Sequence, residues 1–266
     1  MRSTQQDGGY TSVLSRAFAL LTCFTEADGD LSLAELSRRT GIPKATVHRL
    51  VSQLAHWGAV EQTPAGVRLG MRLFELGQLA PRQRDLREAA RPHMEDLRQA
   101  TADTVHLAVL DGSDVVYLEK LTGRRGPPLP SRVGGRMPAH CTGVGKSLLA
   151  FSPDATVAEV VASGLVRRTP RTITIPAVLL RELADIRRSG LAFDREESTP
   201  GVVCVACPVL GRTGDVVAAV SISGWSNRLD PGRVASAVRT ATLAISRQLA
   251  PVRAPGPRPG SDASPS

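Results

Sequence analysis

The sequence predicts an α+β protein with two domains joined by helices, and three observations lead to this prediction. Residues 12–72 show helix-like periodicity on both sides of a Gly-Ile-Pro turn and then a short hairpin pattern. Residues 73–100 continue as helices, and residues 101–250 mix strand patterns with further helices. With 266 residues, of which 42% are hydrophobic, the chain is long enough to bury two cores.

Composition indicates a cytoplasmic protein. Aromatic residues make up only 3%, so Leu, Val, Ile and Ala must fill the cores. No stretch reaches the roughly 18–20 apolar residues of a membrane helix, and residues 1–9 lack the apolar segment of a secretory signal. The four cysteines are too few and too scattered for a disulfide framework. We therefore expect free thiols, no membrane partner and a cytoplasmic location.

The positive charge of the chain is unevenly distributed. The net charge is +8, but residues 1–90 hold 11 basic against 9 acidic residues, so most of the excess lies further along the chain. Within residues 38–72, however, Glu61 is the single acidic residue among the lysines and arginines. This local excess supports nucleic-acid binding by the N-terminal domain, whereas the total charge decides little.

The N-terminal domain begins with a helix predicted over residues 13–25. Its apolar stripe consists of Leu14, Phe18, Leu20 and Leu21.

A pair of helices follows, and local signals mark its ends. Ser32 and Glu35 form a capping box, in which each side chain satisfies a backbone N–H at the helix start. The first, short helix ends near Gly41, because glycine tolerates a left-handed helix terminus. Pro43 lies where a second helix begins, and that helix runs to about Trp57. Its inner face is apolar: Val47, Leu50, Val51 and Leu54.

Residues 61–69 predict two short strands around a Pro-Ala-Gly turn, which completes a winged helix-turn-helix. In this motif the second helix of the pair enters the major groove of DNA. We predict that its outer face and the hairpin contact bases or phosphates through Lys44, Thr46, His48, Arg49, Gln53 and Arg68. An ordinary helical hairpin would share the periodicity, but the cap, the turn and the hairpin together favour the DNA-reading unit.

The rest of the chain predicts two linker helices and a sensor-type α+β domain. The linker helices cover residues 71–79 and 82–100. Strands are predicted at 104–110, 115–121, 191–195, 202–210 and 216–223, and helices at 145–151, 155–162, 177–189 and 232–249. Residues 1–11 are polar and residues 251–266 carry five prolines, so we expect a flexible N-terminus and a disordered tail.

A glycine-rich motif at residues 143–147 resembles the end of a phosphate-binding loop. The full pattern needs a glycine where this chain has His140, and residues 134–138 make a poor strand before it. A helix start of this kind could instead bind a small anion through its backbone N–H groups, or it could simply pack tightly on the sheet. Both of these alternatives remain open.

Other polar residues of the C-terminal domain give weaker signals. Cys204 and Cys207 could suggest zinc or thiol chemistry, but residues three apart on a strand face opposite sides, so we favour buried apolar cysteines. Ser221 and Ser223 share one face of an apolar strand and need partners, either backbone or ligand. The histidines fit no metal-ligand spacing and no catalytic triad is evident, so we expect no catalytic residues, no metal and no cofactor.

Several ordered blocks of sequence resemble the IclR family of bacterial transcription regulators, and the resemblance covers residues 11–250. The N-terminal block runs from Leu31 to Leu50 and includes the helix pair. The more specific blocks lie at residues 136–146, 190–197, 201–208 and 219–224.

The resemblance implies a GAF-like effector-binding domain and a homodimer or homotetramer as the working form. It also implies small-molecule effectors, often organic or aromatic acids. Carried over position by position, the effector contacts are Gly143, Val144, Asp194, Cys204, Ser221 and Ser223, with Leu129 and Val202 as further wall residues. Asp194 is an awkward neighbour for a carboxylate, so it could organise loop backbone instead.

We therefore expect a ligand-responsive regulator, more often a repressor in this family, that binds a double-stranded DNA operator and is not an enzyme. The alternative is a small-molecule-binding or nucleotide-using enzyme with an accessory helix-turn-helix, which would use Lys146 or Cys204. A third possibility is a C-terminal domain that acts only in oligomerisation.

Overall fold

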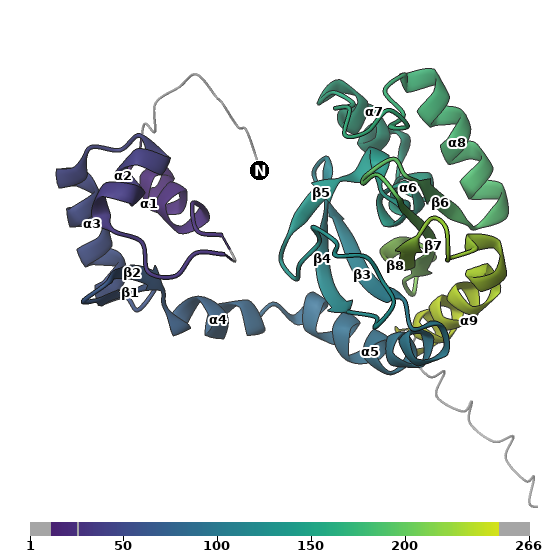
Figure 1. Cartoon of the computed structure of the whole chain (residues 1–266), viewed down its shortest axis with the longest axis horizontal. Helices are drawn as coiled ribbons and strands as arrows, with labels where there is room; N and C mark the ends of the chain where they lie inside the picture. The colour runs from purple at the N-terminus through teal and green to yellow at the C-terminus, as the bar shows by residue number, and fades with distance from the viewer. Residues whose placement is uncertain (1–11, 26, 250–266) are drawn as a thin grey trace, which may run out of the picture. The chain divides into compact units, whose positions relative to one another are not determined.

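The computed structural model describes residues 12–25 and 27–249, shown as a ribbon in Figure 1. These residues divide into two compact units, one ending at Arg84 and the other beginning at Asp85. The flexible start predicted at residues 1–11 and the tail predicted at residues 251–266 lie outside the described residues.

The N-terminal unit has the winged helix-turn-helix order that the sequence predicts. Its elements are α1 (Val13–Thr22), α2 (Leu33–Thr40), α3 (Lys44–His56), β1 (Val60–Thr63), β2 (Gly66–Leu69) and α4 (Met71–Gln78). Leu20, Leu36 and Val47 bring α1, α2 and α3 together in one apolar core. An isolated bridge between Leu31 and Val67 joins the hairpin to the segment before α2.

The predicted cap of α2 is half correct. The Ser32 hydroxyl accepts a hydrogen bond from the Glu35 N–H at 3.1 Å, as expected. The Glu35 carboxylate turns instead to Arg38 and Arg39, each at 2.7 Å, because guanidinium groups bind a carboxylate more strongly than a backbone N–H does. α2 ends at Gly41, whose φ of +70° is the left-handed conformation that glycine tolerates.

The predicted apolar stripe of α1 is wrong in part. The helix ends at Thr22 rather than residue 25, and Leu20 is its buried residue. Leu14 and Phe18 are 71% and 65% exposed. Periodicity identifies an apolar face, but it does not distinguish a face that meets the core from one that remains on the surface of a single chain.

The C-terminal unit is an antiparallel sheet with helices on both faces. The helices are α5 (Pro81–Thr101), α6 (Gly143–Ala150), α7 (Asp154–Ala162), α8 (Pro176–Ser189) and α9 (Pro231–Leu249). The strands are β3 (Thr104–Asp111), β4 (Asp114–Leu121), β5 (Arg136–Pro138), β6 (Ala192–Arg195), β7 (Val202–Leu210) and β8 (Val216–Trp225), in the order β5-β4-β3-β8-β7-β6. The predicted α+β class is confirmed.

Helices lie against both faces of this sheet (Figure 1), and an apolar core fills the space between helices and sheet on each face. α5 and α9 pack on one face, where α5 contributes Leu86, Ala90, Met94 and Leu97 at helical spacing. α6, α7 and α8 pack on the other face. The predicted linker helix α5 therefore supplies a layer of the C-terminal core.

One strand of the sheet is not predicted by the sequence. Residues 136–138, within the stretch expected to make a poor strand, form β5 and pair with residues 114–116 of β4. Pro138 is compatible with this position because β5 lies at the edge of the sheet, where one side of the strand has no neighbour. Within residues 12–25 and 27–249, no helix combines the length and the apolar character that crossing a bilayer requires.

Candidate functional site

The predicted DNA contacts of α3 lie on its outer face, away from the core of its unit. Four of these side chains are exposed and one is half-buried: Lys44, His48, Arg49 and Gln53 in the first group and Thr46 in the second. The opposite face is buried through Val47, Leu50 and Val51. The exposed face of α3 thus carries the side chains that the winged helix-turn-helix motif would use in a major groove.

The sixth predicted DNA contact, Arg68, lies on β2 of the hairpin. It is paired with Glu61 on β1, and the guanidinium lies 2.7 Å from the carboxylate. Both side chains remain about half exposed, and exposed ion pairs contribute little free energy in water. The Arg68 guanidinium therefore stays accessible to solvent while it is paired with Glu61.

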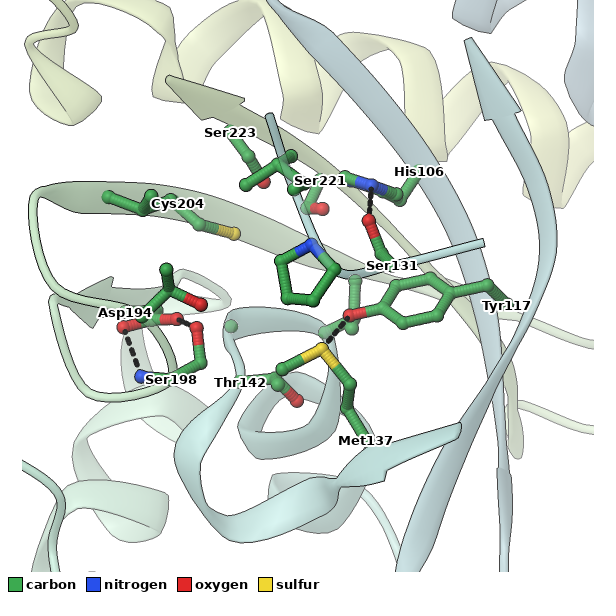
Figure 2. A pocket seen from close by; sticks show the side chains of 16 residues that line it. His106, Tyr117, Ser131, Met137, Thr142, Asp194, Ser198, Cys204, Ser221 and Ser223 are labelled. Atoms are coloured by element: carbon green, nitrogen blue, oxygen red, sulfur yellow. Dashed lines mark hydrogen bonds between the residues drawn. The ribbon is translucent and has the colours of Figure 1, made fainter. Parts of the chain in front are cut away.

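A small cavity lies between the sheet and the start of α6 in the C-terminal unit (Figure 2). All six predicted effector contacts line it, as do Leu129 and Val202: Gly143, Val144, Asp194, Cys204, Ser221 and Ser223. Its volume is about 30 Å³. A single water needs about 10–15 Å³ in a cavity, so this space admits molecules of the size of one or two waters.

Strand register explains why these residues meet. Asp194 pairs with Cys204, and Cys204 pairs with Ser223. Ser221 in turn pairs with His106. Because paired residues of neighbouring strands point to the same face, two polar rows cross the sheet beneath α6.

The start of α6 is built for close approach to the sheet. Thr142 caps the helix by accepting a hydrogen bond from the Gly145 N–H at 3.2 Å. A Cβ at Gly143 would lie 2.6 Å from the Cys204 Sγ, so only glycine fits there without displacing its neighbour. The first N–H groups of a helix have no partner within it, and those of Gly143 and Val144 belong to residues that line the cavity. Tight packing and anion binding are therefore compatible uses of these glycines.

Asp194 organises the loop after β6. Its carboxylate accepts hydrogen bonds from the Glu197 N–H at 2.7 Å and from the Ser198 hydroxyl at 2.6 Å. Burial raises the pKa of Asp194, and these hydrogen bonds oppose that effect. The loop residues Ser198 and Thr199 form part of the cavity wall.

Several cavity residues were not identified from the sequence: His106, Tyr117, Ser131, Met137, Thr142 and Ser198. His106 Nε2 lies 2.8 Å from the Ser131 hydroxyl, and the Tyr117 hydroxyl donates to the Met137 sulfur at 3.5 Å (Figure 2). Burial lowers the pKa of His106 to about 3, so its imidazole is neutral at physiological pH. The available sequence signal was a single histidine inside an otherwise apolar strand.

Lys146 of the phosphate-loop-like motif is not available to a nucleotide. Its side chain is fully buried, and its ammonium group lies 2.6 Å from Glu197 and 3.0 Å from Glu182. The lysine thereby ties α6 to α8 and to the loop that Asp194 organises. The motif shares residue types with a phosphate-binding loop, but its lysine is held in a buried ion-pair cluster.

The cysteines behave as the strand geometry predicts. Cys204 lines the cavity, whereas Cys207 packs in the apolar core on the opposite face, and both are free thiols. Burial raises the pKa of Cys204 to about 12 and that of Cys207 to about 11, which disfavours the nucleophilic thiolate. Among the residues that the structure describes, no group of three or more metal-ligating side chains is placed to hold an ion.

Relatives of known sequence share this organisation. The IclR helix-turn-helix domain matches residues 13–64, and the C-terminal domain of the bacterial transcriptional regulator IclR matches residues 78–247. The HTH-type transcriptional regulator XynR of Escherichia coli is 35% identical over 242 residues, which cover 89% of this chain and 96% of the relative. The transcriptional repressor IclR of Escherichia coli is 30% identical over 231 residues, which cover 85% and 84% of the two chains.

Solved structures show the same similarity. An IclR homologue from Microbacterium hydrocarbonoxydans, in complex with 4-hydroxybenzoate, superposes with a TM-score of 0.83 at 31% identity and covers 90% of this chain and 99% of its own. The Thermotoga maritima IclR gives a TM-score of 0.73 at 33% identity, with 89% and 98% covered. The matched regions follow the same order as the two units described above, and this protein belongs to the IclR family of bacterial transcriptional regulators.

Proposed function

We propose that this chain is a cytoplasmic transcriptional repressor that binds a promoter operator as a dimer or tetramer and responds to a small organic acid in the cavity beneath α6. The observation that carries the proposal is the convergence of a helix start, a neutral histidine and two strand hydroxyls on one cavity, in a chain that also carries a winged helix-turn-helix.

The start of α6 offers hydrogen-bond donors for a carboxylate, and His106 with Ser131 offers partners for a hydroxyl. The neighbouring Asp194 carboxylate is bound by the Glu197 N–H and the Ser198 hydroxyl. N–H groups at a helix start, together with the helix dipole, favour a negative charge near Gly143 and Val144. His106 and Ser131 can exchange hydrogen bonds with a neutral hydroxyl. Among the described residues that line the cavity there is no lysine or arginine, so neutral donors would hold the acid. The homologue bound to 4-hydroxybenzoate binds a ligand with both groups.

A ring-sized effector requires the cavity to enlarge. Benzene occupies an engineered cavity of about 150 Å³, whereas the space here is about 30 Å³. Two segments of the wall lie outside regular strands: residues 129–131 and residues 196–201. Ligand entry would thus shift one or both of them.

An enzymatic role is not favoured by the same geometry. Lys146 is held in a buried ion-pair cluster, and burial keeps the Cys204 thiol protonated. The relatives described above are named as regulators, and we extend that assignment to this chain.

Calorimetric titration of the full chain with 4-hydroxybenzoate tests the effector site. Replacing both Ser221 and Ser223 by Ala removes two hydrogen-bonding groups of about 1 kcal/mol each, so the affinity should fall by roughly tenfold or more. The matched control is Ser236→Ala, an exposed serine of α9. Equal affinities of wild type and double variant would place the ligand elsewhere, and no binding at all would exclude this ligand class.

DNA binding is tested with a duplex that the full chain selects from random sequence. Arg49→Ala should weaken binding by about 1–3 kcal/mol if the guanidinium reads a base, and affinity should fall steeply with salt. Arg233→Ala, in the C-terminal unit, is the control. Unchanged affinity of the Arg49 variant would contradict its assignment as a DNA contact.

A further inference from the structure

Two adjacent residues of β4 point to opposite faces of the sheet and hold different elements. Lys120 pairs with His106 and therefore points toward the cavity side, whereas Glu119 pairs with Leu107 and points toward α5. Lys120 therefore contacts the cavity wall, while its neighbour Glu119 contacts α5, the helix that follows the DNA-binding unit in the chain.

On the cavity side, Lys120 holds the wall segment at residues 129–131. Its ammonium group donates hydrogen bonds to the Ser131 carbonyl at 2.5 Å and to the Leu129 carbonyl at 3.4 Å. His106 binds the Ser131 hydroxyl from the same side. A ligand that displaces this segment must therefore act on Lys120.

On the opposite side, Glu119 holds α5. Its carboxylate is buried and lies 3.4 Å from the guanidinium groups of both Arg87 and Arg91. These contacts are at the long end of the hydrogen-bond range, where about 2.9 Å is usual. The Nε of Arg87 is also buried without a hydrogen-bond partner. Glu119 thus joins β4 to α5 through Arg87 and Arg91, and we call these three residues the clamp.

The backbone between the two faces is irregular. Leu107 pairs with Glu119 and Ala108 pairs with Tyr117, so Leu118 is an extra residue that forms a β-bulge. A bulge interrupts the ladder of hydrogen bonds and allows local adjustment of the strand. This bulge lies directly between the cavity residue Tyr117 and the clamp residue Glu119.

We propose that Glu119 and Lys120 are positioning residues that couple the effector cavity to α5. Displacement of residues 129–131 by a ligand moves Lys120 and the bulged end of β4, and this changes how Glu119 holds Arg87 and Arg91. α5 follows α4 and the winged unit in the chain, so the change is passed toward the DNA-binding part. As a mechanism of regulation, this inference rests on the proposed function.

Hydrogen exchange of the full chain, without ligand or DNA, tests the coupling through Lys120→Met and Glu119→Gln. Lys120→Met should speed exchange in residues 86–98 of α5, and Glu119→Gln should speed exchange in residues 129–133, each by about tenfold as local opening becomes easier. Lys120→Arg, which keeps the cation, should restore the wild-type pattern. Glu95→Gln is the matched control, because Glu95 pairs with Arg98 on the same helix and should affect α5 alone.

Two exchange results would contradict the coupling between the cavity and α5. If each variant changes exchange only on its own face, or if exchange rises equally in α8, the two residues are merely structural and the inference is overturned. In a second arm, 4-hydroxybenzoate should change α5 exchange in the wild type but not in Glu119→Gln. Failure of that ligand to bind would count against the proposed effector class, whereas the ligand-free result alone decides the coupling.

Discussion

At the scale of single residues, the burial of His106 links the stability of the folded protein to pH. Its imidazole is buried, lies against Ser131, and has a pKa lowered to about 3 by loss of solvation and, secondarily, by Lys120. The folded protein therefore keeps His106 neutral where an unfolded chain, with a pKa near 6.5, would bind a proton. The free energy of unfolding is therefore highest above pH 6.5, where neither state binds the proton. It falls as the pH decreases toward 3, because only the unfolded chain binds the proton in that range.

We predict that replacing His106 by Gln flattens the acid dependence of stability. With one buried neutral histidine, the free energy of unfolding falls by about 1.4 kcal/mol for each pH unit below the unfolded pKa of the histidine, or by about 2 kcal/mol between pH 6.5 and 5. Urea unfolding at pH 7 and pH 5 should show this difference between wild type and variant. Ser236→Ala, an exposed serine of α9 that carries no titrating group, is the control and should keep the wild-type slope. Parallel slopes for wild type and His106→Gln would show that the histidine is protonated in the folded state.

At the scale of elements, the close contact of α6 with β7 brings the helix start to the cavity. We predict that Gly143→Ala destabilises the protein by about 1–3 kcal/mol, because the new methyl group would overlap the Cys204 Sγ. The next neighbour of that methyl group, the Ala206 Cβ, is at an ordinary 3.5 Å.

Removing the sulfur should therefore relieve the strain. In the double variant Gly143→Ala with Cys204→Ala, the loss measured by urea unfolding should be smaller than the sum of the two single losses. Strictly additive losses would show that the conflict lies elsewhere along α6.

Elements also show what local sequence can and cannot predict. The helix pair, the hairpin and most strands were predicted within a few residues, because caps, turns and periodicity act over short distances. β5 was missed because its strand character depends on pairing with β4 and not on its own Gly- and Pro-containing sequence. The cap of α2 was half wrong because Arg38 and Arg39 compete for Glu35.

At the scale of the whole molecule, a single chain leaves large apolar side chains on the surface of its N-terminal unit. On α1 these include Leu14 and Phe18, on α4 they include Met71 and Phe74, and Leu79 follows directly after α4; all five are more than 60% exposed. Exposed apolar groups in such numbers are typical of surfaces that another chain covers. They support the proposed homo-oligomer.

We predict that Phe18→Glu combined with Phe74→Glu reduces the size of the oligomer, because two charges would be buried in an apolar contact. Sedimentation velocity at micromolar concentration should show a dimer or tetramer for the wild type and a smaller species for the variant. Leu243→Glu, an exposed leucine of α9, is the control. A monomeric wild type would exclude the oligomer, and an unchanged variant would place the contact on another surface.

The sequence by itself determined most of the helices and strands and the winged helix-turn-helix, and its resemblance to a known family supplied the six residues expected around an effector. Periodicity, caps and turns are local properties of a chain and therefore predict its elements, whereas the six residues were implied by the family resemblance and not by any local pattern. Only the tertiary structure decided that those six residues share one cavity with His106, Tyr117 and Ser131, that Lys146 is buried between two glutamates, and that much of the apolar stripe of α1 is exposed. These features depend on strand register, loop closure and packing between distant segments, which no local pattern contains.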